Sequence, residues 1–150
     1  MRVTLQRVSE ASVVINHKLH SEIQQGLVVF LGITNLDSPA DIQWLCKKIS
    51  ALRIFSDLAG KMNKSIVEVN GEVLLISQFT LFASTKKGNR PSYLNAAQPE
   101  IAIPLYQNFI KSLELQLNKS IQTGVFGADM QIALVNDGPV TIQLDSKSKE

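Results

Sequence analysis

The chain has 150 residues, of which 45% are hydrophobic and 19% are charged, and its formal net charge is +2. These values are typical of one folded globular domain and exclude a disordered chain, and so small a charge does not by itself indicate a nucleic-acid-binding protein. A single cysteine excludes an internal disulfide, and no apolar stretch approaches the roughly 20 residues that span a bilayer, so we expect a cytoplasmic protein without membrane contact.

The first half of the chain carries the signals of three strands and one helix. Apolar and polar residues alternate in 1–8 and again in 12–20, and 26–33 is a continuous apolar run, which is typical of a fully buried strand. A helix is expected to start at Ser38, a favourable N-cap, with Pro39 in its first position. Its apolar residues then recur every three or four positions and form one stripe: Ile42, Leu45, Cys46, Ile49 and Leu52.

The second half is expected to contain a second helix among further strands. A strand is predicted over 72–82, where the residues are apolar, β-branched and aromatic. A helix is predicted to begin between Gln98 and Pro104, with Pro104 in its first turn, where the missing N–H is tolerated. Three short strands are expected to follow, over 121–126, 130–136 and 139–144.

Asn136-Asp137-Gly138 would suit a tight turn between the last two strands, but Pro139 then removes a backbone donor just where pairing should begin. Either this is an ordinary turn with an unfavourable residue, or the chain has an unusual backbone shape here. The tail at 146–150 is expected to be frayed. Two helices among seven or eight strands indicate one α+β domain over 1–150, with mostly antiparallel or mixed pairing, and exclude a regular βαβ nucleotide-binding fold.

The usual nucleophiles and metal ligands are poorly placed in this sequence. Cys46 falls on the apolar stripe of the first helix, where a free cysteine behaves as a small buried hydrophobe. His17 and His20 lie three apart in a polar stretch, which favours surface histidines over metal ligands. We therefore predict no metal and no cofactor, and neither a Ser-His-Asp triad nor a zinc-hydrolase site.

Polar residues interrupt the apolar segment VLLISQFTLFA. Burying the side chains of Ser77, Gln78 or Thr80 without partners would cost on the order of 1–3 kcal/mol each, so they are either hydrogen-bonded in the core or line a pocket, and both readings stay open. In a straight strand, Ser77 and Phe79 face one side while Gln78 and Thr80 face the other. One site can use all four residues only if the chain bends or bulges here, or if backbone forms part of the pocket.

The segment KKGNRPS gathers three cations around a glycine. Lys86, Lys87 and Arg90 are either part of a solvated charged loop or a phosphate-binding loop at the mouth of a pocket. In the second case they would position a nucleic-acid backbone without reading its sequence.

Three of these segments together resemble the D-aminoacyl-tRNA deacylases, also called D-tyrosyl-tRNA deacylases. They are SQFTLFA at 77–83, KKGNRPS at 86–92 and NDGPVT at 136–141. MRVTLQRVSEASV, GKMNKS and TGVFGADMQ are similar to the same family in the same order, so the resemblance covers nearly the whole chain. One departure is Phe82, where a tyrosine is common in the family.

The resemblance implies a cytoplasmic homodimer with a barrel-like α+β fold. Such an enzyme hydrolyses the ester between a D-amino acid and the 3′ end of a tRNA and also removes glycine from mischarged tRNA. The implied partners are the aminoacylated tRNA end and a second copy of the chain, with no DNA. By the same resemblance, Lys86, Lys87 and Arg90 would bind tRNA.

The resemblance also implies which residues form the site, at the dimer interface. The catalytic pocket of one subunit would contain Ser77, Gln78, Phe79 and Thr80. Gly138 and Pro139 of the other subunit, with a cis peptide bond between them, would reach across as a chiral gate. The supporting residues would be Arg7, Met130, Asn136 and Thr141.

Two mechanisms and one non-catalytic function remain as alternatives. In the first mechanism, backbone N–H groups near Phe79 and Thr80 stabilise the oxyanion, and the 2′-hydroxyl of the ribose helps to activate water. In the second, Thr80 is a covalent nucleophile, which requires a nearby base. The third possibility is an RNA-binding module without catalysis, which would use the three cations of KKGNRPS.

Overall fold

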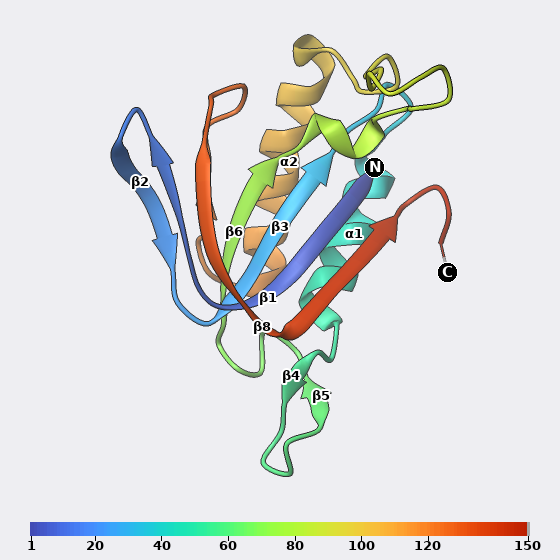
Figure 1. The fold of residues 1–150 in the computed structure, drawn as a ribbon. Coiled ribbons are helices and arrows are strands. Elements are labelled where there is room, and N and C mark those ends of the chain that lie inside the picture. Colours follow the sequence, from blue (N-terminus) through green and yellow to red (C-terminus); the bar gives the residue numbers. More distant parts are fainter. Residues whose placement is uncertain (150) are drawn as a thin grey trace.

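A mixed β-sheet of six strands forms the centre of the fold (Figure 1). The computed structural model describes residues 1–149, and the sheet contains β1 (Arg2–Ile15), β2 (Lys18–Ile23), β3 (Gly26–Gly32), β6 (Glu72–Ser77), β7 (Gln122–Thr123) and β8 (Gln131–Asp145). β1 is antiparallel to β2, β3 and β8, whereas β3 pairs with β6, and β6 with β7, in parallel. The other elements are α1 (Pro39–Ala51), the β4–β5 hairpin (Phe55–Ser56 and Met62–Lys64), the 3₁₀ helix η1 (Phe79–Phe82) and α2 (Pro99–Leu117).

β1 is bent, and its two halves have different neighbours. Residues 2–8 pair with β3, residues 11–15 pair with β2, and β8 follows β1 along nearly its whole length. Register shifts on both sides of Val8 accompany the bend. The second half of β1 carries β2 toward the far edge of the sheet, where Ser21 Oγ donates a 3.0 Å hydrogen bond to the carbonyl of Thr123 in β7. The sheet is thereby nearly closed into a barrel, which confirms the expected barrel-like α+β class.

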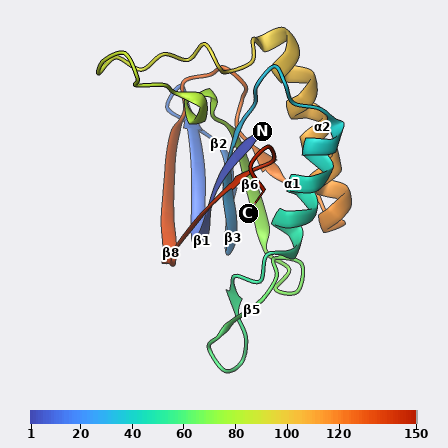
Figure 2. The same ribbon diagram turned by 90° about the vertical axis from the view of Figure 1, so that its right-hand side faces the viewer.

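Hydrophobic clusters lie on both sides of the sheet. α1 and α2 cover one side (Figure 2), where Leu5 and Leu27 of the sheet belong to the same buried cluster as Phe109 of α2. Burial of a side chain of this size stabilises the fold by about 1.5–3 kcal/mol. The second cluster fills the concave side of the bent sheet and consists of Val8, Ala11, Val13, Ile23, Val28, Leu74 and Ile76.

The first helix agrees with its sequence signals, and the second departs from them at one residue. α1 begins at Pro39, and the Asp41 carboxylate accepts hydrogen bonds of 2.8 Å from the N–H and the hydroxyl of Ser38. α2 begins at Pro99, so Pro104 lies in its second turn, and the prediction of the first turn is wrong. Pro99 takes the position that tolerates a missing N–H, and Pro104 removes one bond inside the helix.

The sequence predicted separate strands over 1–8 and 12–20. The boundary between them is absent, because β1 continues to Ile15. Glu10 and Ala11 stay in the sheet by pairing with Val135 and Leu134 of β8, which are more than a hundred residues away along the chain. The turn instead occurs at 16–17, where both residues have positive φ. The segment 12–20 therefore contains the end of one strand, a turn and the start of the next.

The tail is held at its first residues, contrary to the prediction that it is frayed. Ser146 is buried, its N–H donates a 2.9 Å hydrogen bond to the carbonyl of Met1, and its hydroxyl accepts one of 3.0 Å from the Met1 amino group. Lys147 Nζ lies 2.8 Å from the carboxylate of Asp41. Residue 150 lies outside the described residues.

Asp41 links this tail to α1 and should make stability depend on pH. Burial alone would raise the pKa of Asp41, but hydrogen bonds from Lys147, Ser146 and Ser38 outweigh it and hold the pKa well below its ordinary value. A carboxylate whose pKa is lowered by folding stabilises the protein above its unfolded-state pKa of about 4, and this contribution is lost as the pH falls below that value. We expect Asp41→Asn to lower the free energy of unfolding in urea by about 2 kcal/mol at pH 7 and by less toward pH 2.

Glu22→Gln, on an exposed position of β2, is the matched control, and it should change the free energy of unfolding by less than about 0.5 kcal/mol at either pH. Identical urea transitions for Asp41→Asn and the parent at pH 7 would contradict the role of Asp41.

Candidate active site

A pocket of about 290 Å³ lies where β6 ends. Ser77, Gln78 and Phe79 line it, together with Met130 from the segment before β8. Its remaining wall is mostly apolar and comes from five parts of the chain: Leu31, Ile33, Ile76, Ala97, Ala102, Phe126, Gly127, Ala128, Asp129 and Ile132. The structure thus brings together three of the four residues predicted to be catalytic, and one of the predicted supporting residues.

The polar segment reaches this pocket because the strand stops at Ser77. The prediction of a strand over 72–82 is wrong beyond this residue, since Phe79–Phe82 forms η1. Gln78 makes the transition, and its N–H still donates a 2.8 Å hydrogen bond to the carbonyl of Leu31 in β3. η1 packs closely on the end of β3, where a Cβ at Gly32 would lie 3.1 Å from the Gln78 carbonyl oxygen. The bend that the sequence required is therefore a change from strand to 3₁₀ helix.

Thr80 and Phe79 differ in what they offer to the pocket. Thr80 does not line it, and its hydroxyl accepts a 2.5 Å hydrogen bond from Nε2 of Gln78. Phe79 is 57% exposed at the rim, with its ring edge-to-face to that of Tyr93 at a centroid distance of 5.0 Å. The first N–H groups of a helix have no acceptor within it, so those of Phe79 and Thr80 are available as donors.

The NDGPVT segment forms a bulge in one strand and is not a hairpin turn. β8 is continuous from Gln131 to Asp145, and both of its halves pair with β1. Asn136 lies opposite Val8 and Thr141 opposite Gln6, so the four residues between them leave the ladder. The alternative of two strands joined by a tight turn is therefore wrong, and the alternative of an unusual backbone shape at this position is confirmed. Pro139 costs the sheet no hydrogen bond, because it lies within the bulge.

Predicted supporting residues hold this bulge, which consists of residues 137–140. Arg7 is 9% exposed, and its Nε donates a 3.0 Å hydrogen bond to the carbonyl of Asp137 and lies 3.3 Å from the Asp137 carboxylate. The amide of Asn136 accepts a 3.0 Å hydrogen bond from the N–H of Val140 and donates one of 3.2 Å to the hydroxyl of Thr141. The peptide bond between Gly138 and Pro139 is cis, and both residues are exposed.

The bulge and the pocket lie at opposite ends of the same strands. Arg7, beside the bulge, pairs with Leu27 at the start of β3, whereas Ser77 pairs with Leu31 near its end. Four residues of strand correspond to about 13 Å. Within one chain, therefore, Gly138 and Pro139 are not brought to the pocket.

The three predicted tRNA-binding cations lie in an exposed loop next to η1. Lys86, Lys87 and Arg90 are all exposed, and backbone hydrogen bonds of 2.8 and 2.9 Å between Ser84 and Ser92 close the loop at its base. The loop projects past the ends of the strands, away from α1 and α2 (Figure 2).

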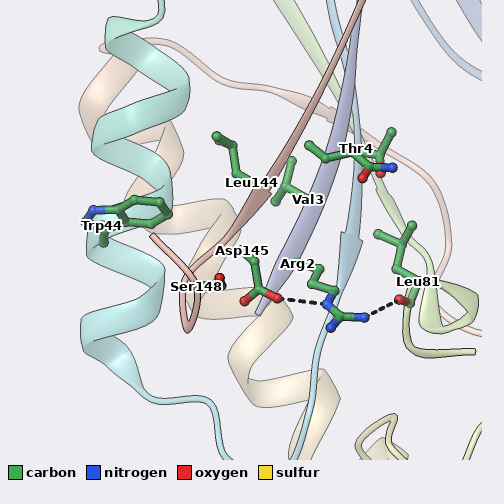
Figure 3. A pocket seen from close by; sticks show the side chains of 9 residues that line it. Arg2, Val3, Thr4, Trp44, Leu81, Leu144, Asp145 and Ser148 are labelled. Carbon is green, nitrogen blue, oxygen red and sulfur yellow. Dashed lines mark hydrogen bonds and ion pairs between the residues drawn. The ribbon is translucent and has the colours of Figure 1, made fainter. Parts of the chain in front are cut away.

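A second pocket, of about 430 Å³, lies between β1, β8 and α1 (Figure 3). Arg2 crosses it, and its Nε lies 2.8 Å from the Asp145 carboxylate while its Nη1 donates a 3.1 Å hydrogen bond to the carbonyl of Leu81. Trp44 forms its opposite wall. No role was predicted from the sequence for this pocket, nor for Phe126 and Asp129 of the first one, although both residues belong to the family-like segment TGVFGADMQ.

The thiol and the histidines behave as the sequence predicted. Cys46 is fully buried, and burial raises the pKa of its thiol to about 12, partly offset by a hydrogen bond with Ser112. His17 and His20 are exposed in and beside the β1–β2 turn. Cys46 is therefore excluded as a nucleophile, because a reactive cysteine must be accessible and partly ionised.

We expect native protein to resist iodoacetamide at pH 8, because Cys46 is both inaccessible and protonated. Mass spectrometry should detect one carbamidomethyl group per chain only after urea is added. Rapid labelling of the folded protein at the same rate as the unfolded protein would contradict the burial of this thiol.

Structural comparison defines the class of protein. A solved structure described as c-Myc DNA unwinding element binding protein has a TM-score of 0.90 and 38% sequence identity, covering 97% of this chain and 98% of that chain. A probable eukaryotic D-amino acid tRNA deacylase has a TM-score of 0.83 over 95% of this chain and 97% of that one; at 15% identity it shows a shared fold. The chain therefore belongs to the class of single α+β domains with this mixed, nearly closed sheet.

Sequence comparison gives the family. The model described as D-Tyr-tRNA(Tyr) deacylase matches residues 4–145. D-aminoacyl-tRNA deacylases of Cytophaga hutchinsonii and Bacteroides fragilis are 63% and 61% identical over 150 residues, with all of each chain covered. The chain belongs to the D-Tyr-tRNA(Tyr) deacylase family, a family of hydrolases, which confirms the resemblance seen in its motifs.

No helix within residues 1–149 is both long and apolar enough to cross a membrane.

Proposed function

We propose that the protein hydrolyses the ester that joins a D-amino acid, or glycine, to the 3′ end of a tRNA, and so acts in translation quality control in the cytoplasm. The observation that carries this proposal is the pocket at the end of β6, where Ser77, Gln78 and Phe79 of the family motif line a mostly apolar wall. Membership of the deacylase family supports the substrate class.

The reaction needs stabilisation of negative charge more than it needs a nucleophilic side chain. Attack of water on the ester gives a tetrahedral intermediate, and the free N–H groups of Phe79 and Thr80 would donate hydrogen bonds to its oxyanion. The 2′-hydroxyl of the terminal ribose would help to activate the water. Even without a triad, an oxyanion hole and substrate binding give roughly 10³–10⁴-fold catalysis over water.

A second copy of the chain is needed to complete this site. The exposed Gly138 and Pro139 lie about 13 Å along the strands from the pocket of their own chain, so only the bulge of a partner would enter it. We therefore place the active site at the interface of a homodimer, with Met130 against the pocket and Arg7, Asn136 and Thr141 holding the bulge.

The bulge would act as a chiral gate made of backbone. D- and L-amino acids differ only in the direction of Cβ, so selection requires a surface that blocks one direction. Carbonyl oxygens of Gly138 and Pro139 that hold the α-amino group would leave room for Cβ on the D side alone. Backbone cannot rotate away as a side chain can, so the clash with an L-amino acid exceeds the 1–3 kcal/mol of a missing methylene. Glycine has no Cβ, so the bulge would not exclude glycyl-tRNA from the pocket.

The function is tested with matched D- and L-tyrosyl-tRNA at equal concentration. The protein should accelerate release of D-tyrosine and leave the L-ester at its spontaneous rate. Equal acceleration of the two esters would reject the gate alone, whereas spontaneous lifetimes for both esters in the presence of protein would reject both the activity and the gate. The latter result would favour the RNA-binding module, for which the loop with Lys86, Lys87 and Arg90 is the supporting observation.

Thr80→Val tests the alternative in which Thr80 is the nucleophile. Among residues 1–149, the Thr80 hydroxyl is hydrogen-bonded to the amide of Gln78, which is not a base. We expect the variant to keep kcat within about tenfold of the parent, because only a positioning hydrogen bond is lost. Loss of all turnover together with loss of a trapped acyl-enzyme would instead support the covalent mechanism.

A further inference from the structure

The β4–β5 hairpin projects from the body of the protein (Figure 1), and it carries GKMNKS, the one family motif to which the proposed function gives no role. Leu58 at its tip is fully exposed, and Lys61 and Met62 are exposed as well. The turn is nevertheless ordered, because the Asp57 carboxylate accepts hydrogen bonds of 2.9 and 3.0 Å from the N–H groups of Ala59 and Lys61. An ordered projection with exposed apolar and cationic side chains is suited to contact another molecule.

Arg7 joins the root of this hairpin to the bulge of β8. Its Nη1 donates a hydrogen bond to the carbonyl of Ile54, immediately before β4, while its Nε donates to the carbonyl of Asp137. The guanidinium is buried and planar, so the two carbonyls are held at one distance. Wherever the bulge is placed, the hairpin therefore accompanies it.

In the proposed dimer the bulge of one protomer enters the pocket of the other, and the hairpin must arrive at the same pocket mouth. The loop that carries Lys86, Lys87 and Arg90 starts from η1 at that mouth and projects past the ends of the strands, away from α1 and α2 (Figure 2). In the proposed dimer, two projections from different protomers would therefore lie beside one pocket.

The β4–β5 hairpin and the loop with Lys86, Lys87 and Arg90 both carry cationic side chains, which indicates the kind of molecule that could bind between them. Within residues 1–149, Lys61 and Lys64 form no ion pair. Lys64 attracts the carboxylates of Asp57 and Glu68, which also accept hydrogen bonds from backbone N–H groups, in the case of Glu68 from that of Ser65 at 2.7 Å. The cations Arg53, Lys61 and Lys64 still outnumber the hairpin carboxylate of Asp57, and the loop carries three cations and no carboxylate. An RNA backbone between the two projections would therefore be attracted to both.

We propose that Lys61 and Lys64 of one protomer and Lys86, Lys87 and Arg90 of the other form one composite site for the phosphate backbone at the acceptor end of the tRNA. The proposal rests on the dimer of the proposed function and adds a second, trans-acting tRNA contact. Binding through phosphates carries no sequence information, so this site accepts any tRNA whose 3′ end enters the pocket.

The first test measures the affinity of the full-length protein for uncharged tRNA by fluorescence anisotropy over a range of salt. Each lost phosphate contact weakens binding by roughly fivefold near 0.15 M salt and lowers the salt slope by about one. Lys61→Ala/Lys64→Ala should therefore weaken binding by about 25-fold and lower the slope by about two. Lys47→Ala/Lys111→Ala, on exposed positions of α1 and α2, is the matched control and should leave both unchanged.

The second test separates a site made in trans from one made within a chain. Mixed dimers pair one protomer carrying Lys61→Ala/Lys64→Ala with one carrying Lys86→Ala/Lys87→Ala/Arg90→Ala. In trans, one pocket keeps both sets of cations and the other loses both, so half of the sites should bind tRNA with the parental affinity. In cis, every site has lost one set, and no tight binding remains.

Three results would overturn the proposal: a monomeric parent, a mixed dimer without tight sites, or an affinity of Lys61→Ala/Lys64→Ala within twofold of the parent. In the last case, weaker dimerisation of that variant would show that the hairpin contacts the partner protein only. These outcomes are distinguishable from failure of the proposed function, because release of D-tyrosine by the parent protein is measured independently of tRNA affinity.

Discussion

Replacing Gly138 with Ala is expected to reduce kcat/KM for D-tyrosyl-tRNA by about 100-fold while the protein remains folded. Gly138 has φ of +133°, a conformation that L side chains rarely adopt. A Cβ there would lie 2.8 Å from Cγ2 of Val140 and 2.9 Å from Nη2 of Arg7, so the bulge must shift. A displacement of about 1 Å at a site that positions substrate costs on the order of 10²-fold in rate.

Asn118→Ala is the control for conformation alone. Asn118 is exposed at the end of α2 and has φ of +51°, a conformation that alanine adopts only at a cost. This variant should lose about 1 kcal/mol of stability and retain deacylation. The measurements are kcat/KM for D-tyrosyl-tRNA from steady-state kinetics and the free energy of unfolding in urea, for both variants and the parent. If Gly138→Ala hydrolysed D-tyrosyl-tRNA within twofold of the parent, the bulge would have no part in catalysis.

Local signals were sufficient for the elements whose residues interact with near neighbours in the chain. Ser38 and Pro39 determine the start of α1 because capping involves residues only three apart. The apolar stripe around Cys46 likewise places the thiol in the core, and with it excludes a cysteine nucleophile.

Non-local pairing explains where the same reasoning failed. Asn136-Asp137-Gly138 has the composition of a tight turn, but β1 pairs with both halves of β8 and converts the turn into a bulge. Pro139 was the only residue whose local preference disagreed with a hairpin. The polar residues after Ile76 showed that a bend was needed, but not that it is a 3₁₀ helix packed closely against Gly32 of β3.

The sequence identified those site residues that lie in segments resembling the family. Ser77, Gln78, Phe79 and Met130 line one pocket as the family resemblance implied. Phe126 and Asp129 line it too and belong to the same segment as Met130, but no role was expected for them. Separation of the pocket from Gly138 could not be read from the sequence, because it depends on the register between β1, β3 and β6.

The second large effect is expected at Arg7, because its guanidinium holds the bulge and the hairpin together. Methionine has a similar length but no donors, so Arg7→Met would leave the carbonyls of Ile54 and Asp137 without their partner. An unsatisfied buried acceptor costs about 1–3 kcal/mol, and we expect the free energy of unfolding to fall by about 2–4 kcal/mol. The bulge would also lose its position, so kcat/KM should fall by at least tenfold under conditions where the variant is folded.

Arg2→Met on the same strand is the matched control for stability, because Arg2 is 48% exposed, its hydrogen bond to the Leu81 carbonyl is exposed, and its ion pair with Asp145 contributes at most about 1 kcal/mol. Arg7→Lys adds a second distinction: it keeps the positive charge but cannot reach two carbonyls with a planar fork. If charge alone mattered, Arg7→Lys would restore both stability and kcat/KM. If the two hydrogen bonds matter, as the geometry at Ile54 and Asp137 indicates, Arg7→Lys should remain closer to Arg7→Met than to the parent in urea unfolding and in deacylation kinetics.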